Sequence, residues 1–162
     1  MTDRKKSAGS RIRTLTYGAV IAAFYVILTY LSALFPGNVG GTVRPAEALC
    51  VLAAFTPAAV PGVTLGCLLS NLLLGGAPAD VVCGTLVTLV SMLAGRLLRK
   101  HPILLPLPTV FLNAAFVPLI LVRCYGMTAG YPVLFVTVFI GEALSAWGLG
   151  MLLFAALRKI RW

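Results

Sequence analysis

The chain is short, strongly apolar and basic, and together these properties exclude a soluble globular domain. It has 162 residues, of which 60% are hydrophobic and 10% are charged, and its mean hydropathy is +1.01. Soluble domains carry about 25% charged residues, so a surface this poor in charge has to face lipid. The net charge of +9 does not indicate nucleic-acid binding, because the thirteen Lys and Arg residues cluster at the ends of apolar runs.

Apolar runs long enough to cross a bilayer follow one another along the chain. About 20 apolar residues are needed to span roughly 30 Å of hydrocarbon. The sequence predicts four such helices, over Leu15–Phe35, Val81–Leu98, Pro106–Val122 and Pro132–Leu157. No small-residue cleavage site leads into a polar segment, so the first run is expected to be a retained helix and not a signal peptide.

The stretch between the first two long runs has two interpretations. It forms either one long helix kinked at Pro57 and Pro61, or two short helices over Pro45–Thr56 and Gly62–Leu74. Each short helix would cover only about 18–20 Å of the membrane. Short spans are tolerated where a helix is buried in protein or lines a cavity, so two short helices would predict a pocket around them.

The distribution of basic residues favours the two short helices, and therefore six crossings. With that count, eleven of the thirteen basic residues share one side, and only Arg44 and Arg123 lie on the other. Lys and Arg concentrate on the cytoplasmic side of membrane proteins. We therefore predict an all-α, multi-pass cell-membrane protein of six transmembrane helices with both ends in the cytoplasm. A basic cytoplasmic tail over residues 1–10 precedes one transmembrane domain over residues 11–160.

Three of the four acidic residues are expected in the outer half of the membrane: Glu47, Asp80 and Glu142. An ionisable group in hydrocarbon costs about 2.5–3.5 kcal/mol, so each is a candidate for substrate binding. Asp80 either caps the helix that follows it or contacts a ligand. Glu142 and Asn113 lie at a matching depth of about 15 Å on adjacent helices. They either floor a shared pocket or form a plain interhelical hydrogen bond.

Other polar and aromatic residues complete the predicted substrate-binding set, and each has a structural alternative. Asn71 offers an amide contact within the third helix, Tyr25 and Trp147 either stack on a flat ligand or pack, and Arg44 is either a ligand contact or an interfacial anchor. The first helix carries two overlapping pairs of small residues near its cytoplasmic end. Small residues let another helix approach closely in lipid, within this chain or in another membrane subunit. These residues are Gly18, Ala19, Ala22 and Ala23.

The motifs of catalysis and metal binding are absent from the sequence. It has no GxxxxGK[ST] loop for ATP, no HExxH, and no Ser/His/Asp set. The four cysteines lie far apart without a CxxC spacing, so they predict neither a metal site nor a disulfide framework. We therefore expect a protein that is not an enzyme and needs no cofactor.

Three sequence blocks resemble those of the QueT family, importers of queuosine precursors. They are Val43–Leu49 (VRPAEAL), Asp80–Leu86 (DVVCGTL) and Pro106–Asn113 (PLPTVFLN), and the similarity extends from about Arg11 to Ile160. The six short helices, the small-residue face and the missing ATP motif resemble, more broadly, the S components of energy-coupling factor (ECF) transporters. An S component is the substrate-binding membrane subunit of these importers.

The resemblance implies a function and partners. The chain would bind a 7-deazaguanine from outside, and a transmembrane coupling subunit (EcfT) with two cytoplasmic ATPases would supply the energy. The small residues of the first helix would contact the coupling subunit. A carboxylate suits the ring N–H and amino donors of a deazaguanine, so Glu142 or Glu47 would bind the guanine-like edge, with Asn113 and Asn71 as amide contacts.

Three alternatives remain open at the level of the sequence. The chain could be an S component for another vitamin, such as riboflavin, thiamine or biotin. It could be a stand-alone proton-coupled transporter that uses Glu142 as its proton carrier. It could also be a membrane scaffold whose polar residues only hold helices together.

Overall fold

The computed structural model describes residues 2–34 and 43–159, with side chains from residue 11 onward, and the regular structure of these residues is helical throughout. Two of the helical runs are continuous through wide π-type turns, η3 into α3 and α5 through η5 into α6. The elements in chain order are α1 (Thr2–Ala33), η2 (Pro45–Ala54), α2 (Ala59–Leu73), η3 (Asp80–Gly84), α3 (Thr85–Leu97), η4 (Pro102–Leu104), α4 (Leu107–Tyr125), α5 (Tyr131–Glu142), η5 (Ala143–Leu149) and α6 (Gly150–Leu157).

Four helical segments are long and apolar enough to cross a membrane, and each overlaps a predicted run. They are Arg11–Ala33, Asp80–Leu97, Pro102–Tyr125 and Tyr131–Leu157. Phe35, the predicted end of the first run, lies outside the described residues. The stretch between the first two runs forms two separate helices, η2 and α2, joined by a turn at residues 55–58, and not one kinked helix. Whether these two shorter helices complete six crossings stays a prediction.

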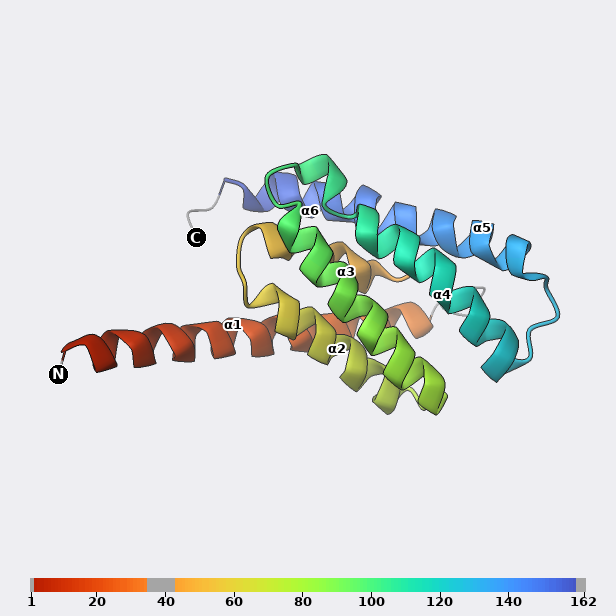
Figure 1. Ribbon diagram of the computed structural model, residues 1–162, viewed down its shortest axis with the longest axis horizontal. Coiled ribbons are helices and arrows are strands. Elements are labelled where there is room, and N and C mark those ends of the chain that lie inside the picture. Colours follow the sequence, from red (N-terminus) through yellow and green to blue (C-terminus); the bar gives the residue numbers. More distant parts are fainter. Residues whose placement is uncertain (1, 35–42, 160–162) are drawn as a thin grey trace.

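The segments alternate in direction across the bundle. Figure 1 shows α1, α2 and α4 running one way and η2, α3 and α5–α6 running the other. The start of α1 and the end of α6 therefore lie toward the same end of the molecule. α1 has 32 residues, or about 48 Å at 1.5 Å per residue, so it is longer than the hydrocarbon core. Residues 2–10, predicted as a basic tail, are a helical extension of α1.

Glycines bring α1 and α2 into direct backbone contact. A Cβ atom added to Gly62 would lie 2.8 Å from the Gly18 carbonyl oxygen, and one added to Gly66 would lie 2.6 Å from Tyr25 Cβ. Such distances are below van der Waals contact, so only glycine permits this approach. The close packing places the side chains of α1 against α2 in a fixed register, which matters for the site described below.

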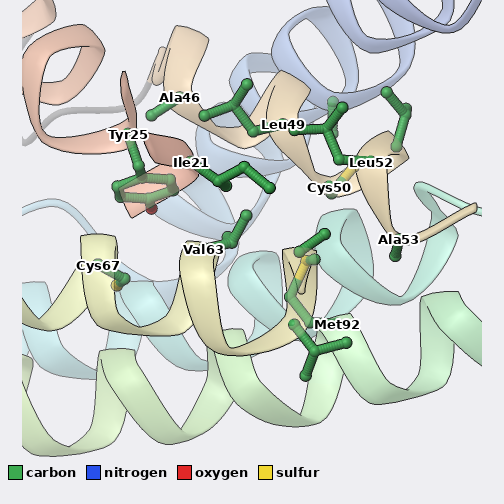
Figure 2. Packing of buried hydrophobic residues seen from close by; sticks show 14 of the residues in the cluster. Ile21, Tyr25, Ala46, Leu49, Cys50, Leu52, Ala53, Val63, Cys67 and Met92 are labelled. Atoms are coloured by element: carbon green, nitrogen blue, oxygen red, sulfur yellow. The ribbon is translucent and has the colours of Figure 1, made fainter. Parts of the chain in front are cut away.

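The short helix η2 runs through the centre of the molecule. All residues from Ala46 to Ala53 are buried, and η2 contacts α1, α2, α3, η5 and α6. It is a 3₁₀ helix of ten residues, which at about 2 Å per residue reaches roughly 20 Å into the bundle. Figure 2 shows η2 side chains such as Leu49, Cys50 and Leu52 among the other members of this core, with Val63 of α2 and Met92 of α3 nearby.

Large apolar side chains cover the outside of the bundle. Leu15 is 73% exposed, and Phe24, Leu86 and Leu144 are each more than half exposed. Soluble monomers rarely present contiguous apolar surface on this scale, whereas a lipid environment requires it. The chain is therefore a helical membrane protein.

Candidate functional site

A cavity of about 460 Å³ opens at the end of the bundle where α1, α2 and α4 finish. We call it the end cavity. Its polar lining comes from Thr29 and Ser32 of α1, Arg44 before η2, Asn71 of α2, and two residues at the rim, Asp80 and Tyr125. The remaining lining residues are Ala33, Leu74, Gly75, Gly76, Val117, Ile120, Leu121 and Met127.

A layer of buried polar residues lies directly beneath the end cavity. Residues four apart on a helix stack on one face, so each helix that lines the cavity places a residue one turn below its wall. On α1, Tyr25 lies below Thr29, and on α4, Asn113 lies below Val117. Cys67 lies in the same way below Asn71 on α2. The buried polar layer, as we define it, consists of Tyr25, Glu47, Cys67, Asn113 and Glu142.

On one side of this layer, hydrogen bonds connect Glu47 to the cavity wall. The Tyr25 hydroxyl donates to Glu47 Oε1 at 2.5 Å, and both residues are buried. The Tyr25 side chain also shares a hydrogen bond with the Cys67 side chain, which faces it across the α1–α2 contact (Figure 2). Asn71 Nδ2 lies 3.7 Å from Cys67 Sγ and 3.5 Å from the backbone oxygen of Asp80. A continuous polar seam therefore runs from the rim of the cavity down to Glu47.

On the other side of the layer, Asn113 of α4 hydrogen-bonds Glu142 at the end of α5. The matching depth predicted from sequence thus corresponds to a side-chain contact. Glu142 is 2% exposed, and its second oxygen, Oε2, is fully buried with no hydrogen-bond partner among the described residues. A buried carboxylate oxygen without a partner is costly, at about 1–3 kcal/mol or more for a charged group. Glu142 is not among the described residues that line the end cavity, so this oxygen is an unpartnered polar atom in the layer beneath it.

Arg44 links the end cavity to both acids. Its side chain lines the cavity and interacts electrostatically with Glu47 and Glu142. Pro45 follows it and fixes the start of η2, and the Glu47 amide donates to the Arg44 carbonyl at 2.9 Å. The Arg44 side chain is therefore part of the cavity wall and close enough to both acids to interact with them electrostatically.

The remaining predicted binding residues fall at different distances from the cavity. Asn71 and Asp80 line it. Asp80 lies inside the helical run that begins at Pro78, and it accepts a hydrogen bond from Tyr125. Trp147 is absent from the cavity lining, and its indole N–H donates to the Ile103 carbonyl of η4 at 2.6 Å. A stacking role for Trp147 therefore gains no support from its position.

The four small residues of α1 separate into two pairs. Gly18 and Ala22 are buried against α2, where the Ala22 carbonyl lies 3.0 Å from the position of a Cβ on Gly66. Ala19 and Ala23 are exposed on the outside of the bundle. The first pair packs within the chain, so only the second pair is free to meet another subunit among the described residues.

Several site residues were missed by the sequence reasoning. Thr29 and Ser32 line the end cavity, and their spacing of four and three residues after Tyr25 places all three on one helical face. That spacing was a signal in the sequence. No comparable spacing marked the other two residues in the sequence. Thr109 forms a side-chain hydrogen bond with Cys50 next to the layer, and Tyr125 lies at the rim of the cavity. Among the described residues, no group of three or more His, Cys, Asp or Glu side chains could hold a metal ion.

A helical membrane protein with a polar cavity at one end and acids buried beneath it has the features of a transport protein that binds a small molecule. Comparison with protein families agrees with that class. The family model described as the QueT transporter matches residues 15–159, and the chain belongs to this family. No curated protein and no solved structure matches the chain.

Proposed function

We propose that this chain is the S component of an ECF-type ABC importer and captures a queuosine precursor from outside the cell. The ligand is a 7-deazaguanine such as queuine or the pre-queuosine base. Membership of the QueT transporter family supports the transport role. The chain has no ATP-binding loop of its own, so the energy comes from a coupling subunit (EcfT) and two cytoplasmic ATPases.

The observation that carries this proposal is the unpartnered carboxylate oxygen of Glu142 beneath the end cavity. A 7-deazaguanine presents a ring N–H and an exocyclic amino group side by side. One carboxylate can accept both, and charge-assisted hydrogen bonds are about twice as strong as neutral ones. Glu142 binds this edge, and Asn113, already bonded to Glu142, orients the carboxylate.

The other polar groups of the site contact the remaining parts of the ligand. Glu47 is held by Tyr25 and forms the second acid of the layer, and Asn71 supplies an amide at the cavity wall. Arg44 interacts electrostatically with both buried acids and balances part of their charge. Ligand binding then exchanges some of these internal contacts for contacts with the deazaguanine.

The topology and the partner surface follow from the same proposal. Six crossings with both ends inside place the end cavity at the outer face, where it can receive the ligand. Ala19 and Ala23 form the flat face of α1 that meets the coupling subunit, because they are small and exposed. Gly18 and Ala22 contribute indirectly, by holding α1 against α2.

Equilibrium binding to the purified protein tests the site. We expect the wild type to bind queuine or its aminomethyl precursor, and not riboflavin or thiamine. Glu142→Gln and Glu47→Gln should each weaken binding at least about tenfold, since each removes a charge-assisted hydrogen bond. Asp3→Asn removes an acid from the start of α1 and serves as the matched control, with unchanged affinity. Unchanged affinity in both Glu variants would contradict the proposed site.

The buried Glu142 carboxylate also supports a second candidate function, a stand-alone proton-coupled transporter. Intramembrane carboxylates commonly carry protons. Uptake into vesicles driven by a pH gradient, without ATP or partner subunits, would favour this candidate. Uptake that depends on ATP and the coupling subunits would favour the S component.

A further inference from the structure

At the rim of the end cavity, Tyr125 joins two segments that lie far apart in the sequence. Its hydroxyl donates to Asp80 Oδ2 at 3.1 Å and accepts the backbone N–H of Ala77 at 3.0 Å. Tyr125 is the last residue of α4, whereas Ala77 and Asp80 lie at the start of the run that becomes α3. Asp80 and Tyr125 both line the cavity, so this arrangement is part of its wall.

Helix capping does not account for this arrangement. Asp80 is already inside the helical run, and no side-chain capping bond is formed at the start of η3. An acid in the first turn gains about 0.3–1 kcal/mol from the helix dipole, but that gain needs no tyrosine from another helix. The Tyr125 hydroxyl instead fixes the orientation of the Asp80 carboxylate at the cavity rim.

The charges around the cavity indicate what that carboxylate binds. Glu47 and Glu142 lie beneath the cavity, and Asp80 is at its rim. Among the described lining residues, Arg44 is the one with a cationic side chain, and it interacts electrostatically with Glu47 and Glu142. Asp80 is thus the acid that lines the cavity itself, whereas the two buried glutamates beneath it already interact with Arg44. A cationic group on the ligand would give the Asp80 carboxylate an ionic partner within the cavity.

We propose that Asp80 is the counter-ion for a cationic substituent of the transported ligand, and that Tyr125 is the positioning residue that makes this recognition selective. The inference rests on the proposed function, because it assumes that the ring of the ligand lies toward Glu142. The substituent of the ring then points toward the rim. Tyr125 holds Oδ2, so the carboxylate is oriented before the ligand arrives and less freedom is lost on binding.

Two ligands that share one ring and differ in charge test the inference. 7-Aminomethyl-7-deazaguanine is a cation at neutral pH, and 7-cyano-7-deazaguanine is neutral. Asp80→Asn should lower the affinity for the cation about tenfold or more and change that for the neutral ligand by less than about twofold. Tyr125→Phe should also weaken binding of the cation more than binding of the neutral ligand. The ratio of the affinity for the cation to that for the neutral ligand should fall by about three- to tenfold.

Tyr131→Phe is the matched control for Tyr125→Phe. Tyr131 is also an exposed tyrosine, its hydroxyl donates to the Ala115 carbonyl at 3.1 Å, and it is absent from the cavity lining. In Tyr131→Phe, the ratio of the affinities for the cationic and the neutral ligand should equal that of the wild type. Equal losses for both ligands in Tyr125→Phe would show a purely structural role and overturn the inference, as would an unchanged ratio in Asp80→Asn. If the wild type bound neither deazaguanine, the proposed function itself would fail. If the wild type bound a deazaguanine but the variants did not change the ratio, only this inference would fail.

Discussion

Gly66→Ala tests whether the α1–α2 contact holds the site together. The new Cβ would lie 2.6 Å from Tyr25 Cβ and 3.0 Å from the Ala22 carbonyl oxygen. Ordinary carbon–carbon contacts are about 3.5–4.0 Å, so α1 has to move away by roughly 1 Å. Neither contacted atom is the end of a flexible side chain, so the displacement falls on the helix. Overpacking of this kind costs about 1–3 kcal/mol.

The gain in helix propensity offsets only part of this cost. Replacing a glycine within a helix by alanine stabilises it by about 0.5–1 kcal/mol. With the middle of each range, the net loss is about 1 kcal/mol, which corresponds to roughly 2–4 °C in the unfolding midpoint for a chain of this size. Because Tyr25 moves with α1, its hydrogen bond to Glu47 weakens, and ligand affinity should fall as well.

Thermal unfolding of the purified protein in detergent measures the effect. Gly148→Ala is the matched control, because a Cβ at Gly148 meets only the Ala143 carbonyl, at 4.0 Å. That variant should unfold at or slightly above the wild-type temperature. A Gly66→Ala protein as stable as Gly148→Ala would refute the close α1–α2 packing and the register of Tyr25 that depends on it.

Three further predictions follow from the described contacts. Arg96→Met removes the 2.7 Å hydrogen bond from the guanidinium to the Ala53 carbonyl at the end of η2. Thermal unfolding should show that the protein is destabilised by about 1–3 kcal/mol. Arg99 is exposed, so Arg99→Met should have no effect. Ala19→Leu with Ala23→Leu should abolish copurification with the coupling subunits and spare ligand binding; Ala155→Leu with Ala156→Leu, also exposed, should leave assembly intact. Cys124 is exposed near the end of α4, which the predicted topology places outside the cell. In a Cys83→Ser background, an impermeant maleimide should therefore label Cys124 in intact cells. Labelling only in inverted vesicles would contradict the predicted topology.

The helices and the depth of polar residues along them were predictable from sequence. Apolar runs and breakers located the four long segments, and residue counting placed Asn113 and Glu142 at one level, where the two side chains are bonded. These successes share a cause. The rise along a helix is fixed at about 1.5 Å per residue, so depth follows from counting alone.

The rotation of each helix about its axis was not predictable in the same way. Neighbouring residues point about 100° apart, so Gly18 and Ala22 face α2 while Ala19 and Ala23 face outward. The sequence shows four small residues and gives no indication of which pair packs internally. The pairing of Tyr25 with Glu47 likewise depends on how α1 and η2 approach each other, which packing of the whole core decides.

Contacts between segments far apart in the chain were also not predictable from the sequence. Tyr125 reaches Asp80 across 45 positions, and Trp147 bonds the Ile103 carbonyl across 44. Both depend on connections whose course the apolar pattern does not specify. The predicted stacking role of Trp147 arose from its residue type alone, and the structure gives that residue a contact with η4 instead.

The most direct test of the central claim is the thermal stability of the purified wild-type protein with a panel of deazaguanines and vitamins. A ligand at about 100 times its dissociation constant stabilises the folded state by roughly 2.7 kcal/mol. The proposed function predicts a clear rise in the unfolding midpoint with queuine or its aminomethyl precursor, and none with riboflavin, thiamine or biotin. A rise with one of these vitamins and none with a deazaguanine would contradict it.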